Sequence, residues 1–341
     1  MNDVGLLSAG EARTGNGFYQ WGLEFVRALQ AIENPVLTAL IKAITVLGSE
    51  LFYVPVVLLV YWCINEKKGH RLTLLLLLSI WINSALKILL KQPRPYFLDP
   101  SVGISAASGY GFPSGHAQLS LVFWAAALSG PLRKKSAWLI AALITLVMGF
   151  TRLYLGLHFP TDLLGGWLIA LFILGAYYFL LQPLEKLLAA GGTRMSMIAA
   201  AMTAFGMNAL YPEDRRFGAL LLGFNIGYLL MRKYFPFSAS ANVPGKFPET
   251  TRWIKSGLVL RFLRFAVGMA GGVLCYYGLK MLLGEDSSLL SRVPFLRAGY
   301  YELGRFLHYG LLGLWVSAGV PWLFLRLGLA DPPQVVLTAS G

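Results

Sequence analysis

Charged residues are scarce in this chain of 341 residues: they make up 13% of the sequence, against roughly 25% in an average soluble domain. Hydrophobic residues make up 56%, and the mean hydropathy is +0.61. A soluble enzyme is excluded because its surface needs more charge, and a disordered chain is excluded because it carries few apolar residues. The composition therefore predicts a membrane protein.

Cysteine is almost absent, with two residues in the whole chain. Cys63 and Cys275 both lie in apolar runs, where a thiol packs as a small hydrophobic side chain. A disulfide-stapled scaffold is therefore excluded, and no disulfide is expected. The first fifteen residues also lack the basic start and compact apolar stretch of a cleaved signal peptide, so we expect the first membrane span to direct insertion.

Long runs without charge are abundant, for example 72–86, 163–184 and 306–325. A bilayer span needs about 20 mostly apolar residues, so we predict an all-α, polytopic membrane protein with about nine transmembrane helices. An interfacial helix at 17–31 and a short apolar helix at 35–47 precede them. The expected spans lie near residues 50–65, 70–91, 114–130, 136–156, 161–182, 195–210, 216–231, 257–283 and 297–326.

A change of composition near 183–195 divides the chain, because an amphipathic stretch ends there in Gly191 and Gly192. No repeat relates the two sides, so an inverted-repeat transporter is not supported. The expected parts are N-terminal interfacial helices at 1–49, a membrane core at 50–182, a linker at 183–194 and a C-terminal membrane block of unknown role at 195–341.

Positive charge is in excess: 29 Lys and Arg against 16 Asp and Glu give a net charge of +13. In a membrane protein this excess marks cytoplasmic loops, so nucleic acid is not expected as a partner. Nearly half of the Lys and Arg residues fall in four alternate loops, at 66–71, 131–137, 183–196 and 232–256. We predict that these loops are cytoplasmic and that the intervening loops face the other side of the membrane.

Three polar clusters lie in the membrane core, on its predicted outward side, at 87–95, 113–116 and 152–162. Two arginines and a lysine supply fixed positive charge and donors suited to a phosphoryl group. The Pro-Ser-Gly-His turn opens a helix, where free N–H groups and the helix dipole attract an anion. Together these features favour a site for a phosphate.

Two histidines complete the set. One imidazole can attack phosphorus while the other protonates the leaving oxygen. His158 lies four residues before Asp162, close enough for the carboxylate to accept a hydrogen bond and fix the tautomer of the ring. The residues thus indicate phosphoryl transfer without a metal.

The clusters resemble the motifs of the type-2 phosphatidic acid phosphatase family, which includes lipid phosphate phosphatases and undecaprenyl pyrophosphate phosphatases. Lys-x6-Arg-Pro begins at Lys87, Pro-Ser-Gly-His ends at His116, and Arg-x5-His-x3-Asp begins at Arg152. The resemblance covers about residues 50–182. It implies a helical membrane phosphatase core in that part of the chain and no cofactor.

The resemblance also implies roles for single residues. His158 would be the nucleophile that forms a phosphohistidine, His116 the general acid, and Asp162 the carboxylate that orients the nucleophile. The residues that would hold the phosphate oxygens are Lys87, Arg94, Ser114, Gly115 and Arg152. The family usually has Ser where this chain has Thr151; the hydroxyl is kept, so we expect a tuned site. Lys91 lies outside the motifs and is interpreted as a flanking charge.

The implied activity is metal-independent hydrolysis of a lipid phosphate or lipid pyrophosphate, at the extracytoplasmic face of a cell membrane (the inner membrane if bacterial). A membrane lipid is the expected substrate because a site at the interface is open to lipid entering sideways between helices. One alternative is a phosphotransferase that passes the phosphoryl group to another lipid. Another is an anion or lipid transporter, which the two histidines disfavour because binding alone needs no nucleophile and acid.

Charged residues also occur inside the C-terminal membrane block. Glu302, Arg305 and His308 recur at three-residue steps in one span, and Arg261 and Arg264 lie in the span before it. Intramembrane charges are costly and usually paired. We therefore interpret them as structural pairs, with a lipid headgroup contact or a regulatory site as the alternative.

Three single polar residues receive structural interpretations. Asn83 and Asn225 lie within spans, where a lone amide forms an interhelical hydrogen bond. His70 lies beside Arg71 in a basic loop, and we interpret it as a solvated side chain.

The charge pattern predicts that positions 67 and 134 are cytoplasmic and that position 105 is external. Single cysteines placed there, in a background lacking Cys63 and Cys275, should separate by their reaction with an impermeant thiol reagent on intact cells. Only position 105 is expected to react before the membrane is opened. Labelling of all three positions from outside would show that the assignment of spans is wrong.

Overall fold

The computed structural model describes residues 17–129, 134–240, 257–283 and 300–330. Within these ranges the regular elements are all helices and none is a strand, which confirms the all-α fold. The chain forms two compact units. Unit 1 contains the described residues up to Val54 and Leu78–Pro183, and unit 2 contains Pro55–Leu77 and the described residues from Leu184 onward.

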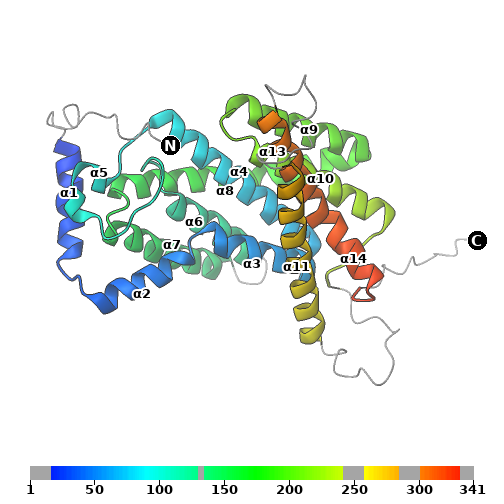
Figure 1. The fold of residues 1–341 in the computed structure, drawn as a ribbon, viewed down its shortest axis with the longest axis horizontal. Helices are drawn as coiled ribbons and strands as arrows, with labels where there is room; N and C mark the ends of the chain where they lie inside the picture. The colour runs from blue at the N-terminus through cyan, green and yellow to red at the C-terminus, as the bar shows by residue number, and fades with distance from the viewer. Residues whose placement is uncertain (1–16, 130–133, 241–256, 284–299, 331–341) are drawn as a thin grey trace, which may run out of the picture. The chain divides into compact units, whose positions relative to one another are not determined.

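Unit 1 holds the N-terminal helices and the three polar clusters. In Figure 1, α6 and α7 pack side by side, and α1 and α2 both contact α7. The elements of unit 1 are α1 (Gly17–Gln30), α2 (Pro35–Val46), the start of α3 (Glu50–Cys63), the second part of α4 (Glu66–Leu90), α5 (Pro95–Leu98), η2 (Pro100–Val102), α6 (Gly115–Leu128), α7 (Lys134–Tyr154) and most of α8 (Pro160–Ala190).

The two N-terminal helices have clear local causes. Asn34 caps α2 by accepting a hydrogen bond from the Leu37 N–H at 2.9 Å, and Pro35 occupies the first turn, where no N–H partner is needed. Helix α1 is amphipathic: Val26 is buried, whereas Trp21 is 48% exposed. This pattern is typical of a helix that lies along a membrane interface.

Unit 2 is built around α10 and α13, which lie against each other along their length (Figure 1). The helices approach so closely that a Cβ at Gly223 would lie 1.8 Å from the Gly310 carbonyl oxygen, so only glycine fits there. The elements of unit 2 are the rest of α3 and α4, the end of α8, α9 (Gly192–Leu210), α10 (Arg216–Tyr234), α11 (Gly257–Leu283), α13 (Tyr300–Leu314), η5 (Trp315–Gly319) and α14 (Val320–Arg326).

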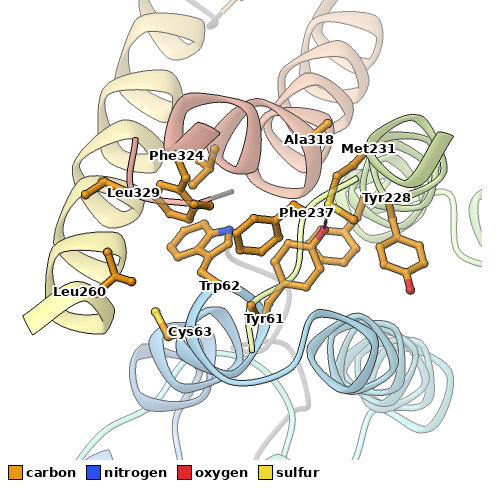
Figure 2. Packing of buried hydrophobic residues seen from close by; sticks show 14 residues of the cluster. Tyr61, Trp62, Cys63, Tyr228, Met231, Phe237, Leu260, Ala318, Phe324 and Leu329 are labelled. Carbon is orange, nitrogen blue, oxygen red and sulfur yellow. Dashed lines mark hydrogen bonds between the residues drawn. The ribbon is translucent and has the colours of Figure 1, made fainter. Parts of the chain in front are cut away.

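The core of unit 2 is aromatic and centres on Tyr61 and Trp62 of α3 (Figure 2). Their polar atoms form hydrogen bonds with the π-helical segment η5. In this segment the Val320 N–H donates to the Trp315 carbonyl, five residues back, and Pro321 has no N–H to donate. The carbonyls of residues 316 and 317 therefore lack helical partners. The Trp62 Nε1–H donates to the first at 3.1 Å and the Tyr61 hydroxyl to the second at 2.7 Å.

Helix α8 continues to Ala190, through most of the segment expected as a linker. Its last turns belong to unit 2, where Glu185 forms a bidentate ion pair with Arg71 and lies 3.7 Å from Lys67. These cations hold the end of α8 against the first turns of α4.

The expected number of nine spans is not confirmed. Among the described residues, five helical stretches are long and apolar enough to cross a membrane, or six if α2 and α3 form one broken span. Helix α6 is too short, with 14 residues. Helices α9 and α10 have 19 residues each, but neither is apolar enough to count as a span. The stretches that do are Glu66–Leu98, Lys135–Tyr154, Pro160–Ala190, Gly257–Leu283 and Glu302–Arg326.

Two of the charged side chains in the C-terminal membrane block form ion pairs, as expected. Arg305 donates to Asp214 at 3.1 Å, and Glu302 lies 3.5 Å from Arg215. Arg264 instead uses the backbone, donating to the carbonyl oxygens of residues 329 and 239. In α13, Glu302 and Arg305 are thus paired, whereas the His308 ring packs against Tyr276. For Arg264 the expected charge pair is replaced by backbone carbonyls.

The interpretation of His70 as a solvated side chain is wrong. Its ring stacks on Tyr228 with centroids 3.8 Å apart, and its Nε2 lies 3.0 Å from the Asn225 side-chain oxygen. The interhelical hydrogen bond expected of Asn225 is thereby confirmed. The basic residues around His70 misled the sequence reasoning, because its aromatic partners lie far along the chain.

We expect Arg305→Ala to destabilise the protein by about 1–3 kcal/mol, because Asp214 is 8% exposed and loses one of its two arginine partners. The thermal unfolding midpoint in detergent should fall, while the preference among substrates stays the same. Lys186→Ala, which removes an exposed charge from the same unit, is the control. A changed preference at an unchanged midpoint would contradict the structural role.

Candidate active site

All the predicted site residues lie in unit 1, at helix ends and in the loops between them. Lys87 lies in the last turn of α4, Arg94 precedes α5, and Arg152 lies in the last turn of α7. His158 lies in the loop that follows, and Asp162 in the first turn of α8. Ser114, Gly115 and His116 open α6.

The pair of His158 and Asp162 is buried, with each residue 2% exposed. His158 Nδ1 lies 3.1 Å from Asp162 Oδ2, and the same oxygen accepts a hydrogen bond from the Phe159 N–H at 3.0 Å. The backbone around the histidine therefore fixes the carboxylate, which in turn fixes the ring. This is the contact that the spacing predicts.

Arg94 sets the tautomer of the histidine. Its NH1 lies 3.3 Å from His158 Nε2. An arginine can only donate, so Nε2 presents its lone pair and Nδ1 carries the proton that goes to Asp162. Burial, reinforced by the Arg94 and Lys87 cations, lowers the pKa of His158 well below its ordinary value. The imidazole is therefore neutral, with an unprotonated Nε2 that accepts from Arg94.

The loop before α6 receives most of the donors of two predicted phosphate ligands. Lys87 Nζ donates to the carbonyls of Tyr110 at 2.8 Å and Gly111 at 3.0 Å. Arg94 donates to the carbonyls of residues 108 and 109 at 2.9 and 2.8 Å, and to that of residue 157 at 3.0 Å. Both cations thus hold carbonyl oxygens, the same kind of acceptor that a phosphate offers.

The Pro-Ser-Gly-His turn is tied directly to the third cluster. The Ser114 N–H donates to the Asp162 backbone carbonyl at 2.9 Å. Its hydroxyl oxygen caps α6 by accepting from the Ala117 N–H at 3.5 Å, and its hydroxyl proton remains available to an anion. The free N–H groups of the first turn of α6, beginning at Gly115, therefore lie close to the His158–Asp162 pair.

Arg152 and His116 meet at a residue that sequence reasoning did not identify. Arg152 NH1 donates to the Thr45 hydroxyl at 3.1 Å, and the His116 imidazole hydrogen-bonds the backbone carbonyl of the same threonine. Thr45 lies in the last turn of α2, far along the chain from either partner. No spacing in the sequence signals this contact.

Behind the turn, Asn83 contacts two polar residues that sequence reasoning missed, Gln118 and Ser79. The Asn83 amide donates to the Pro113 carbonyl at 3.3 Å and to the Gln118 side-chain oxygen at 2.9 Å, which confirms its interhelical role. Gln118 in turn donates to Ser79. Ser79, Asn83 and Lys87 follow one another at four-residue steps, so they share one face of α4. That polar stripe is a signal that the sequence did contain.

Positive charge dominates the site. Lys87 interacts electrostatically with Arg94 and Arg152, and the Asp162 carboxylate interacts with Lys87 and Arg94. Arg94 and Arg152 are 4% and 7% exposed, so solvent screens them weakly. Among the described residues, no three His, Cys, Asp or Glu side chains come together as metal ligands. The arrangement is suited to an anion that approaches the unprotonated Nε2 of His158.

Comparison with known families gives two matches. Residues 69–186 match the PAP2 superfamily, and residues 216–332 match the transmembrane extension of PAP2 superfamily phosphatases. The first match contains every predicted site residue, and the second falls within unit 2. The N-terminal helices α1 and α2 precede both matches.

Several curated proteins are similar to the first part of the chain. An undecaprenyl-diphosphatase of Sulfolobus acidocaldarius is 26% identical over 45% of this chain and 75% of its own. Phosphatidylglycerophosphatase B of Bacillus subtilis is 27% identical over 47% of this chain and 81% of its own. Sphingosine-1-phosphate phosphatase 2 of Mus musculus is 30% identical, and the match covers 39% of each chain.

One solved structure is similar. It is a crystal structure of a transmembrane PAP2 type phosphatidylglycerolphosphate phosphatase from Bacillus subtilis, with 26% sequence identity and a TM-score of 0.43. The likeness covers 52% of this chain and 90% of that one.

Gly156 determines where the His158 loop runs. Its φ is +69°, and a Cβ there would lie 1.8 Å from the Val102 carbonyl oxygen. We expect Gly156→Ala to cost at least about 1–3 kcal/mol from the backbone alone and to move His158 away from Asp162. Thermal unfolding and turnover of the purified protein are the measurements. Gly175→Ala, in a helix with open space around it, is the control and should leave both unchanged.

Proposed function

This chain belongs to the PAP2 superfamily, and we propose that it is an integral membrane phosphatase that hydrolyses a lipid phosphate or a lipid pyrophosphate through a phosphohistidine at His158. The names of its relatives support the substrate class, since they refer to undecaprenyl diphosphate, phosphatidylglycerophosphate and sphingosine 1-phosphate. The apolar helical stretches support residence in the bilayer.

The observation that carries the proposal is the state of His158. Its Nδ1 is bound to Asp162, its Nε2 keeps a lone pair, and cations surround it. A neutral imidazole held in this tautomer is a nucleophile, and a neighbouring positive field lowers the barrier by stabilising charge on a phosphoryl group. A purely structural histidine needs neither feature.

In the proposed first step, the Nε2 lone pair of His158 attacks phosphorus and the bond from phosphorus to the leaving oxygen breaks. His116 gives its proton to that oxygen, so the product leaves as a lipid alcohol or a lipid phosphate. Lys87, Arg94 and Arg152, with the N–H groups at the start of α6, stabilise the oxygens of the transferring group. Asp162 stabilises the imidazole as it becomes positive.

In the second step, water attacks the phosphohistidine and His116 takes a proton from it. The bond between phosphorus and nitrogen breaks, which releases inorganic phosphate and returns His158 to its neutral form. Because the protein's own cations hold the charge in both steps, we propose that no metal is needed.

We propose that the site faces the extracytoplasmic side of a cell membrane, which is the inner membrane if the source is bacterial. The support is the alternation of basic loops: 66–71 and 183–196 flank the spans on one side, and the site loops lie at the other ends of the same helices. Arg133, Lys246, Arg252 and Lys255 also belong to the predicted basic loops but lie outside the described residues.

Loss of the nucleophile tests the mechanism. We expect His158→Ala to abolish phosphate release from a panel of lipid phosphates and pyrophosphates, and His116→Ala to slow it by about 10²- to 10⁴-fold. Wild-type protein should work in EDTA, and acid-quenched wild type should carry labelled phosphate on His158. A fully active His158→Ala enzyme would contradict the role of His158 as the nucleophile. Label that appears on an acceptor lipid rather than in water would favour the phosphotransferase.

A further inference from the structure

We propose that Thr45, in the last turn of α2, is a positioning residue that holds both Arg152 and His116 in the geometry needed for phosphoryl transfer. The inference rests on the proposed function and deepens it. Helix α2 lies before the residues that match the superfamily, so the motif residues alone do not complete the site. Four observations carry the proposal.

The first is how Arg152 is held. This arginine is 7% exposed, and its NH1 donates to the Thr45 hydroxyl oxygen at 3.1 Å. Its Nε is buried and has no hydrogen-bond partner in the part of the chain that the structure describes. A buried donor without an acceptor is costly. The contact with Thr45 therefore fixes one side of the guanidinium while another donor stays available for an anion.

The second observation is the pair of contacts that the Thr151 hydroxyl makes. Thr151 Oγ1 lies 2.7 Å from the Met148 carbonyl oxygen and 3.1 Å from Thr45 Oγ1, and it is the donor toward both acceptors. Thr45 Oγ1 therefore accepts from Thr151 and from Arg152 NH1. The two threonine hydroxyls and the guanidinium form one connected group, so a change at either threonine is expected to reach Arg152.

The third observation concerns His116. The Thr45 carbonyl accepts a hydrogen bond from the His116 imidazole and another from the Gly48 N–H at 3.1 Å. It belongs to the last turn of α2, where carbonyls lack helical partners and carry partial negative charge. One residue therefore orients the proposed general acid through its backbone and a proposed phosphate ligand through its side chain.

The fourth observation is close packing at the same place. A Cβ at Gly48 would lie 2.7 Å from His116 Cδ2 and 2.8 Å from the Met148 sulfur. The end of α2 thus packs tightly on the imidazole and on the turn of α7 that holds Thr151. Such contact leaves Arg152 and His116 little freedom to shift separately.

The test compares Thr45→Val, which removes the hydroxyl and keeps the shape, with Thr45→Ser, which keeps the hydroxyl. Purified full-length protein is assayed for kcat and KM on a lipid phosphate and for binding of orthovanadate. We expect Thr45→Val to lower kcat/KM and to weaken orthovanadate binding by about 10- to 100-fold, as for one lost hydrogen bond to a charged group. Thr45→Ser should restore most of both.

Thr38→Val is the matched control. Thr38 lies on the same helix, and its hydroxyl lies 2.8 Å from the hydroxyl of Tyr154, which is not one of the proposed site residues. We expect Thr38→Val to lower the unfolding midpoint at least as much as Thr45→Val while it keeps kcat/KM and orthovanadate affinity near wild type. Equal losses of activity in the two valine variants would overturn the proposal, because they would indicate a general effect on α2.

A double-mutant cycle tests the coupling of the two threonines. If Thr45 and Thr151 act as one unit, Thr151→Val should weaken orthovanadate binding, and the double variant should be little worse than Thr45→Val alone. Independent, additive losses would overturn this coupling. Wild-type kcat/KM and affinity in Thr45→Val, or a Thr45→Ser variant as impaired as Thr45→Val, would overturn the positioning role itself.

Failure of the proposed function is distinguishable from failure of this inference. If wild-type protein releases no phosphate from any lipid, the proposed function fails and binding alone decides the role of Thr45. Weaker orthovanadate binding by Thr45→Val than by Thr38→Val would still support it. Equal binding by the two variants, or no binding by wild type, would overturn it.

Discussion

Three positive charges gathered around the buried His158 are the constraint on which the site depends. Lys87, Arg94 and Arg152 come from three different helix ends, and the Asp162 carboxylate interacts with the first two. Cations that repel one another stay together in a folded protein only where hydrogen-bond acceptors replace the water they have lost. Here backbone carbonyls and a threonine hydroxyl are those acceptors. The unbalanced charge makes the region receptive to an oxyanion.

The helix ends gather at the site because each polar cluster lies at the edge of an apolar stretch. The carboxylate of Asp162 holds His158, while its backbone carbonyl accepts from Ser114, so the third cluster and the turn before α6 are one connected structure. The N-terminal helices add a further wall through Thr45 and through Gln30, whose amide donates to the carbonyls of residues 102 and 154. Positions before the superfamily match thus belong to the same packed unit as the motifs.

The sequence predicted contacts that depend on local spacing and missed those that depend on tertiary packing. His158 and Asp162 are four residues apart at a helix start, so their hydrogen bond followed from the chain itself. Thr45 and Arg152 are 107 residues apart, and no periodicity links them. His70 failed for the same reason, since its neighbours in sequence are basic and its partners in space are aromatic. Apolar runs gave the helices but not the number that are long enough to cross a bilayer.

The backbone carbonyls of residues 108–111 already occupy the hydrogen-bond donors that an anion would use at this site. Lys87 and Arg94 already donate to these oxygens, so an arriving anion that takes a donor also displaces a backbone acceptor. Any affinity measured for an anion there is the difference between two sets of hydrogen bonds. The loop is in this sense an internal competitor for any anion that uses these donors.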